Sequence, residues 1–178
     1  MSPVDFRYPV GEFERPPLPL RPEQRAAHVA EVAALPDRFE AALVGLGDAQ
    51  LDTPYRPGGW SVRQVAHHLP DSHMNAFIRF KLALTEPVPT IKPYDEAAWA
   101  GLADVRDTPV ATSLRLLRAL HERWGALLRS LGEDDWARTY RHPELGTTLS
   151  LDHALAMYAW HGRHHTAHVT ELRGREGW

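Results

Sequence analysis

The sequence predicts an all-α fold, a four-helix bundle, on three observations. Apolar residues recur at intervals of three and four over four long segments, as they do in amphipathic helices. Residues that cap helices, such as Ser61 and Ser150, stand at the start of these segments. No segment shows the alternation of apolar and polar residues that is typical of a strand. With 178 residues, the chain is expected to form one bundle domain over residues 22–178.

Residues 1–21 are predicted to form an extended, proline-rich N-terminal arm. Six of the 15 prolines precede Glu23, and each one removes a backbone donor and fixes φ. The first residues, MSPVDFRYPVGEF, also lack the charged and apolar regions of a secretory signal peptide. We therefore expect a cytoplasmic protein.

The first two long helices are predicted over 23–46 and from Ser61 to about Leu84. Apolar residues at helical spacing mark the first helix: Val32, Leu35, Phe39, Leu43 and Leu46. The stretch DTPYRPGGW then has the composition of a turn, and Ser61 with Gln64 forms the S-x-x-Q pattern of a capping box.

A long crossover, which contains EPVPTIKP and the short piece YDEAAWA, leads to the third helix. Thr108 before Pro109 predicts its cap, and Gly132 its end. Ser150 predicts the cap of the fourth helix, and Gly174 its end. The apolar seam of the third helix is Val110, Leu114, Leu117, His121, Trp124, Leu128 and Leu131, and that of the fourth is Leu151, Leu155, Tyr158, Gly162, His165, Val169 and Leu172.

Composition excludes several classes of function. The 20 Lys and Arg against 23 Asp and Glu give a net charge of -3 with no basic tract, which argues against a nucleic-acid partner. The chain has no Cys, which excludes disulfides, thiolate ligands and a Cys nucleophile. No apolar run approaches the roughly 20 residues of a membrane-spanning helix. The 11 His and 6 Trp are the unusual feature.

Two histidines of the fourth helix have the spacing of a metal site. His165 lies about 40° and His161 about 80° from the centre of the apolar seam, so both can point inward. Side chains at i and i+4 are neighbours, which lets two imidazoles share one ion. His164 and His168 lie about 140° and 100° away and are less suited to an inward-facing pair.

The second helix offers a third imidazole in HHLPDSH. His68 lies nearer the apolar face than His67, and His73 lies nearer still, so periodicity alone leaves the choice open. We expect His73 to be a buried, hydrogen-bonded core residue, and His67 to face solvent or to bond a neighbouring loop.

The remaining histidines are expected to have other roles. His121 lies on the seam of the third helix, so we expect it to belong to the core or to support a ligand rather than to be a fourth ligand. The others are expected on the surface: His28, His142 and His153.

Several longer motifs carry a family resemblance. The run W-S-x-x-x-x-x-H-H-L from Trp60 to Leu69, the turn PYRPGGW before it, and the segments DSHMNAFIRFKLALTE, PTIKPYDEAAW and YAWHGRHHTAH after it cover almost the whole chain. In these motifs the sequence resembles the YfiT-like members of the DinB superfamily, which are described as metal-dependent hydrolases.

The resemblance implies a four-helix bundle, usually a homodimer, in which three His hold one zinc or nickel ion per chain and water fills the open positions. The ligand of the second helix is the His directly before Leu, which is His68 here, and the other two fall on His161 and His165. His168 stands where the wider superfamily often has Gln, so the resemblance implies no role for that position.

A three-His site leaves an open position on the ion, as in catalytic rather than structural zinc sites. Zinc can lower the pKa of water from 15.7 to about 7, which favours hydrolysis of a small-molecule substrate. Gly162 stands where the H-E-x-x-H motif of zinc peptidases places its general base, so that class is not expected. Asp71 is the nearest carboxylate that could take a proton, with Asp152 and Glu171 behind it, although a solvated acid on a helix face is the simpler expectation for each.

Two alternatives stay open at this point. A metal-coordinated thiol is deprotonated, so the same site would suit a transferase that uses a low-molecular-weight thiol of the bacillithiol type, an activity linked to several DinB-like proteins. In the second alternative, the metal only stabilises the helix bundle and has no catalytic role. A fourth protein ligand such as His121 would favour this alternative.

Overall fold

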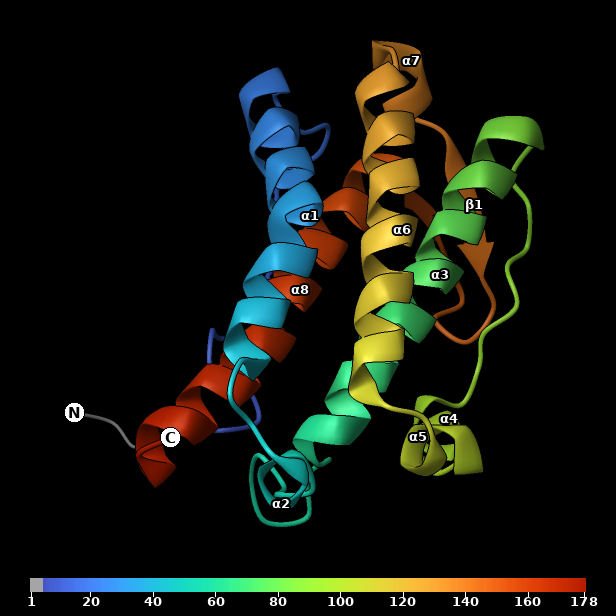
Figure 1. Cartoon of the computed structure of the whole chain (residues 1–178). Coiled ribbons are helices and arrows are strands. Elements are labelled where there is room, and N and C mark those ends of the chain that lie inside the picture. Colours follow the sequence, from blue (N-terminus) through green and yellow to red (C-terminus); the bar gives the residue numbers. More distant parts are fainter. Residues whose placement is uncertain (1–4) are drawn as a thin grey trace.

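The computed structural model describes residues 5–178, and it confirms the predicted four-helix bundle (Figure 1). The four long helices are α1 (Pro22–Leu43), α3 (Val62–Thr85), α6 (Val110–Ser130) and α8 (Leu151–Glu176). Each long helix contacts two others: α1 packs against α6 and α8, and α3 packs against the same two. The order around the bundle is therefore α1, α6, α3, α8, which makes neighbours of α3 and α8.

The core consists of two groups of buried side chains. Phe80 and Trp124 belong to the first group, and Phe39, Leu69 and Leu117 to the second. All five are fully buried. Burying a side chain of this size contributes about 1.5–3 kcal/mol, so the bundle has a sizeable apolar core that does not depend on a metal ion.

The helices α1 and α8 approach closely at Gly162, in the middle of α8. A Cβ atom at this position would lie 2.9 Å from Cδ2 of Leu35 in α1. Such a contact is shorter than real Cβ atoms tolerate, so a larger residue would require the Leu35 side chain to shift.

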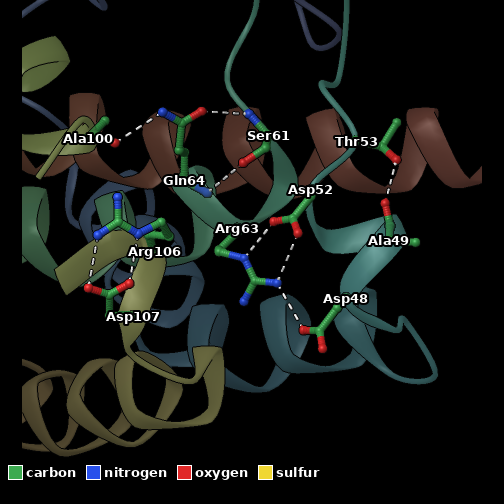
Figure 2. Close-up of polar contacts among 10 residues, drawn as sticks. All are labelled: Asp48, Ala49, Asp52, Thr53, Ser61, Arg63, Gln64, Ala100, Arg106 and Asp107. Carbon is green, nitrogen blue, oxygen red and sulfur yellow. Dashed lines mark hydrogen bonds and ion pairs between the residues drawn. The ribbon is translucent and has the colours of Figure 1, made fainter. Parts of the chain in front are cut away.

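The predicted caps of α3 and α8 are confirmed. Ser61 Oγ accepts a hydrogen bond from the backbone N–H of Gln64 at 3.1 Å, and Gln64 Oε1 accepts one from the N–H of Ser61 at 2.9 Å (Figure 2). Ser150 Oγ accepts from the N–H of His153 at 3.2 Å. These bonds satisfy amides that lack partners at a helix N-terminus.

Two predicted helix ends are wrong. Thr108 does not cap α6, because its own N–H bonds to Asp104 O and thereby ends a short helix, α5 (Ala103–Asp107). Pro109 occupies the N-cap of α6 instead. Gly174 lies inside α8, which ends at Gly177 with φ of 72°, a value that glycine adopts without strain.

The expectation that the chain contains no strand is also wrong. After α7 (Glu133–Trp136), strands β1 (Thr139–His142) and β2 (Thr147–Ser150) pair in an antiparallel hairpin. Tyr140 and Leu149 face each other across it, and each is the single fully buried residue of its strand. With one buried residue per strand, no alternation is visible in the sequence.

The crossover between α3 and α6 is fixed at two points. Ile91 N–H donates to Arg141 O at 3.1 Å, which joins the crossover to β1. The crossover then forms α4 (Glu96–Ala100), whose last carbonyl accepts from Gln64 Nε2 at 3.0 Å (Figure 2). Helices α4 and α5 lie at the same end of the bundle as the short α2 (Asp48–Leu51), opposite α7 (Figure 1).

The arm contains no helix or strand from Asp5 to Arg21, and residues 1–4 of the predicted arm lie outside the described residues. It packs along α8, where Trp160 Nε1 donates to Gly11 O at 3.1 Å and the Leu20 N–H donates to Asp152 Oδ2 at 3.0 Å. Among the helices described, none combines the length and the apolar character that crossing a membrane requires.

Candidate metal centre

The structure brings His68, His161 and His165 together. His68 comes from the first half of α3, and the other two lie one turn apart on α8. One ring nitrogen from each lies within 4.8 Å of the others, and the Nε2 atoms of His68 and His161 are 3.3 Å apart. Three imidazole nitrogens at this spacing can converge on one ion.

The turn before α3 forms one wall of this centre. The Trp60 ring packs on His68 at a centroid distance of 4.7 Å and lies nearly parallel to His165, at 11°. The N–H of Tyr55 bonds to Trp60 O at 3.0 Å and closes the turn. Gly58 within it has φ of 68°, which explains why glycine stands there.

The three histidines lie in the wall of a pocket of about 370 Å³. This volume is within the range of small-molecule sites. The described residues that line it are Tyr55, Arg56, Gly58, Gly59, Trp60, His68, Glu96, Trp160, His161, His164, His165 and His168. The pocket is therefore mostly aromatic, with one cationic and one anionic side chain.

Glu96 is the residue that sequence reasoning missed. It is the first residue of α4 and lines the pocket with the three histidines. Although Glu96 keeps much of its surface accessible, desolvation raises the pKa of its carboxyl group above the ordinary value of 4.5. Only the folding of the crossover over the start of α3 brings this carboxylate to the site, and no periodicity in the sequence signals that.

The candidate Asp71 is not among the described residues that line the pocket. Desolvation and the neighbouring Asp104 raise the pKa of its carboxyl group to about 6. Although Asp71 lies one turn beyond His68 on α3, it does not share the pocket of the three histidines. Glu171 is exposed on α8, as expected.

The expectations for His73 and His121 are confirmed, because both are buried and hydrogen-bonded. His73 Nδ1 lies 2.9 Å from His121 Nε2, and His73 Nε2 lies 3.1 Å from His161 Nδ1. His121 Nδ1 lies 2.7 Å from the carbonyl oxygen of Val32. Because both nitrogens of His121 contact protein groups, His121 is a hydrogen-bonded core residue, and neither nitrogen is free to bind an ion.

Three other expectations are wrong, each because the residue is buried. His67 does not face solvent but is 5% exposed, and its Nδ1 lies 2.7 Å from Ser113 Oγ of α6. His153 is 4% exposed, with Phe13 of the arm against its ring. Asp152 is not a solvated acid but forms an ion pair with Arg25 of α1. His28 and His142 are partly exposed.

His164 and His168 are also buried, against the expectation from their angles on α8. The ring of His168 stacks on Tyr55 at 3.8 Å, and that of His164 stacks on Trp160 at 4.5 Å. Together with His165 they form a second group of three imidazoles with a nitrogen within 4.8 Å of each other. All three Nδ1 atoms of this group lack a hydrogen-bond partner within residues 5–178.

The first group fits an ion better than the second. Metal-bound histidines usually bond a protein group through the nitrogen that does not face the ion. His161 has such a bond, to His73. Moreover, the first group spans two helices, whereas the second lies on a single helix.

Burial keeps the candidate ligands neutral. It lowers the pKa of His68 to about 4, and burial with the nearby His68 lowers the pKa of His161 and that of His165 well below the ordinary value. Neutral imidazole is the form that binds a metal ion, so all three have a lone pair available at neutral pH.

We expect acid to destabilise the metal-free protein. The pKa values of His68 and His121 are about 4, against 6.5 for an ordinary histidine. Below pH 6.5 the unfolded chain takes up protons that the folded chain does not, so the free energy of unfolding should fall by up to about 1.4 kcal/mol per pH unit for each such ring. Urea unfolding at several values between pH 7 and pH 5 measures this, and an unchanged midpoint would contradict it.

The family of the chain follows from comparison with known proteins. The DinB superfamily matches residues 31–169, which is well over half of the chain. The chain belongs to the DinB superfamily. Within it, the "Putative metal-dependent hydrolase YfiT" of Bacillus subtilis (strain 168) is 47% identical over 178 residues, which cover 100% of this chain and 99% of the relative.

Further relatives agree over the same length. The "Putative metal-dependent hydrolase" of Bacillus cereus (strain 03BB102) is 53% identical over 174 residues, which cover 98% of this chain and 99% of the relative. The solved structure of YfiT from Bacillus subtilis, a "probable metal-dependent hydrolase with an unusual four-helix bundle topology", matches with a TM-score of 0.95 and covers 98% of this chain and 99% of that one. This DinB-superfamily chain thus shares its complete fold with a solved YfiT structure.

Proposed function

We propose that the protein is a metal-dependent hydrolase in which His68, His161 and His165 hold one divalent zinc or nickel ion. The observation that carries the proposal is the convergence of three neutral imidazole nitrogens in the wall of a small-molecule pocket. The donor set fits, because imidazole suits zinc and nickel alike. Three protein ligands are also the number found in catalytic zinc sites.

When bound, such an ion would make water a nucleophile near neutral pH and polarise the bond to be cleaved. The remaining tasks fall to the residues of the pocket. Among the described residues, Glu96 is the only carboxylate in the pocket lining, and its raised pKa places it closer to neutral pH than an ordinary glutamate. We infer that Glu96 accepts the proton that the attacking water releases.

The two anchors of the crossover hold Glu96 in place for this role. One is the bond from Ile91 to β1, and the other is the bond from Gln64 to Ala100 at the end of α4. Glu96 lies between these points, and it lines the same pocket as the three histidines.

The pocket also indicates the kind of substrate. Among the described residues, Arg56 is the only Lys or Arg in the pocket lining, and it belongs to the turn before α3. The rings of Trp60, Trp160 and Tyr55 give flat apolar walls. A small ester or amide with an anionic group and a planar or apolar part would complement these features.

Replacing Glu96 with Gln should lower turnover about 10²- to 10⁴-fold while the metal content stays at one ion per chain. In the unchanged protein, turnover should fall as pH decreases through the pKa of Glu96, because only the ionised carboxylate accepts a proton. A panel of small esters and amides, assayed against pH with the metal-loaded protein, measures both effects. Asp71→Asn is the matched control and should keep normal turnover, since Asp71 lies outside the pocket lining. Full turnover in Glu96→Gln would contradict the role of Glu96 as the proton acceptor.

A low-molecular-weight thiol S-transferase is the second candidate. The observations that favour it are the absence of Cys from the chain and the position of Arg56, which could hold a carboxylate of a small thiol beside the three histidines. In that case no hydrolysis should occur without thiol. A thiol with an electrophile should then give a metal-dependent adduct, in which a new S–C bond replaces the bond to the leaving group.

A site with four protein ligands and no exchangeable water would contradict both activities. It would favour a metal ion that only stabilises the helix bundle.

A further inference from the structure

One chain of hydrogen bonds crosses the centre of the bundle and contacts all four long helices. It begins at the carbonyl oxygen of Val32 in α1 and continues through His121 of α6 and His73 of α3 to His161 of α8. The contacts measure 2.7, 2.9 and 3.1 Å in that order. Val32, His121 and His73 are at most 2% exposed.

The carbonyl end of this chain determines where each proton lies. A carbonyl oxygen only accepts, so His121 must carry its proton on Nδ1, and the Nε2 of the neutral ring is then an acceptor. His73 must therefore donate from Nδ1 to His121, which leaves its own Nε2 as an acceptor. By the same step His161 donates from Nδ1 to His73, and its Nε2 keeps a lone pair.

The lone pair that results is the one the metal centre needs. The Nε2 atom of His161 faces the Nε2 atom of His68 at 3.3 Å. We propose that His121 and His73 are positioning residues, which lock the tautomer and the direction of His161 so that its Nε2 is ready to bind the ion. This proposal rests on the proposed function in one respect, that an ion binds at His68, His161 and His165.

The chain cannot serve as a path for protons to solvent, because it ends on a carbonyl oxygen that has no proton to pass on. Nor can His73 become a ligand without breaking the chain, because both of its nitrogens are engaged. The aromatic rings of Trp124 and Tyr158 pack edge-on against His73 at 5.7 and 5.3 Å, which restricts its rotation. The remaining role is orientation of the one ligand that the chain reaches.

His165 provides the internal contrast. Its Nδ1 atom is buried and has no hydrogen-bond partner within the part of the chain that the structure describes. His161 alone among the three ligands is thus held through its far nitrogen by a buried histidine. Outer partners of this kind typically account for 10- to 100-fold in metal affinity.

The tautomers can be measured directly in the metal-free protein by long-range ¹H–¹⁵N correlation spectra of ¹⁵N-histidine-labelled samples. We expect His73, His121 and His161 all to carry their protons on Nδ1. A proton on Nε2 of His73 or of His121 would overturn the proposal. This measurement needs no variant, no bound ion and no substrate, so it does not depend on the proposed function.

Metal affinity, measured by competition with a chelator, tests the consequence. We expect His121→Phe and His73→Leu to weaken zinc binding about 10- to 100-fold. His73→Gln, whose amide oxygen can still accept from His161, should recover part of that loss. The matched control is His67→Leu, because His67 is also buried but bonds Ser113 and stands outside this chain of hydrogen bonds.

Unchanged affinity in folded His121→Phe and His73→Leu proteins would overturn the positioning role, as would an equal loss in His67→Leu. Failure of the proposed function would look different, since the unchanged protein would then bind no zinc or would bind it without hydrolysis. The spectra of the metal-free protein decide the tautomers in either case.

Discussion

Replacement of any one of His68, His161 and His165 with alanine should abolish tight retention of the metal ion. Each removal leaves two imidazoles, and the loss of affinity should exceed the 10- to 100-fold that removal of an outer partner costs. Elemental analysis of the purified variants after dialysis measures the effect. Because the two groups of buried apolar side chains, which include Phe80 and Phe39, stay intact in these variants, circular dichroism should still show a mainly helical protein.

Two neighbouring histidines supply matched controls. His67→Ala and His164→Ala should retain about one ion per chain, because neither belongs to the group of His68, His161 and His165. The second control is the sharper one, since His164 belongs to the other group, with His165 and His168. Metal loss in His164→Ala together with retention in His68→Ala would show that the ion binds to the other group instead.

Replacement of Asp152 with alanine should reduce the free energy of unfolding by about 3–5 kcal/mol, the usual cost of removing one partner from a buried ion pair. Arg25 would then keep only Glu133, whose side chain is 73% exposed, as an ion-pair partner. The side chains of Arg25 and Asp152 are 8% and 3% exposed, and Arg25 Nε donates to Asp152 Oδ1 at 2.7 Å. Asp152 also accepts from the N–H of Leu20, so its loss detaches the arm as well. At about 2–4 °C per kcal/mol for a chain of this size, Tm should fall by roughly 6–20 °C in a calorimetric scan.

The exposed pair of Arg118 and Asp37 is the control for this prediction. Both side chains are largely accessible, so Asp37→Ala should leave Tm nearly unchanged. Replacing Arg25 with Met and Asp152 with Leu together should recover much of the stability lost in Asp152→Ala, because no unpaired charge remains in the interior. Equal small shifts for Asp152→Ala and Asp37→Ala would show that burial adds nothing to the strength of the Arg25 pair.

The bundle itself could be predicted from the sequence because its signals are local. Helical spacing and the capping residues Ser61 and Ser150 act within a few positions of each other, and the structure confirms them. The hairpin of β1 and β2 could not be predicted. Each strand buries only one residue, so the sequence shows no alternation of apolar and polar residues there. The choice between His67 and His68 needed the family motif, since the two differ only in which neighbouring helix each ring meets.

The errors around α8 share one physical cause. In an isolated bundle, Asp152, His153 and His164 would face water, and their angles on the helix predict that. The arm covers this side of α8, so that Leu20, Phe13 and Tyr8 lie against Asp152, His153 and His164 in that order. Helical periodicity describes a helix against other helices, and it carries no information about irregular segments that pack over it.

The close approach of α1 and α8 at Gly162 has a consequence for how this scaffold can diversify. Gly162, the residue after His161, lies against Leu35, so a carboxylate at this position would displace the Leu35 side chain. In the hydrolase proposed above, the proton acceptor comes instead from a connecting segment, the crossover with Glu96. The ligands and the acceptor would then be encoded in stretches of sequence that can change independently. Exchange of that segment would alter the acceptor while the four helices and their three histidines stay as they are.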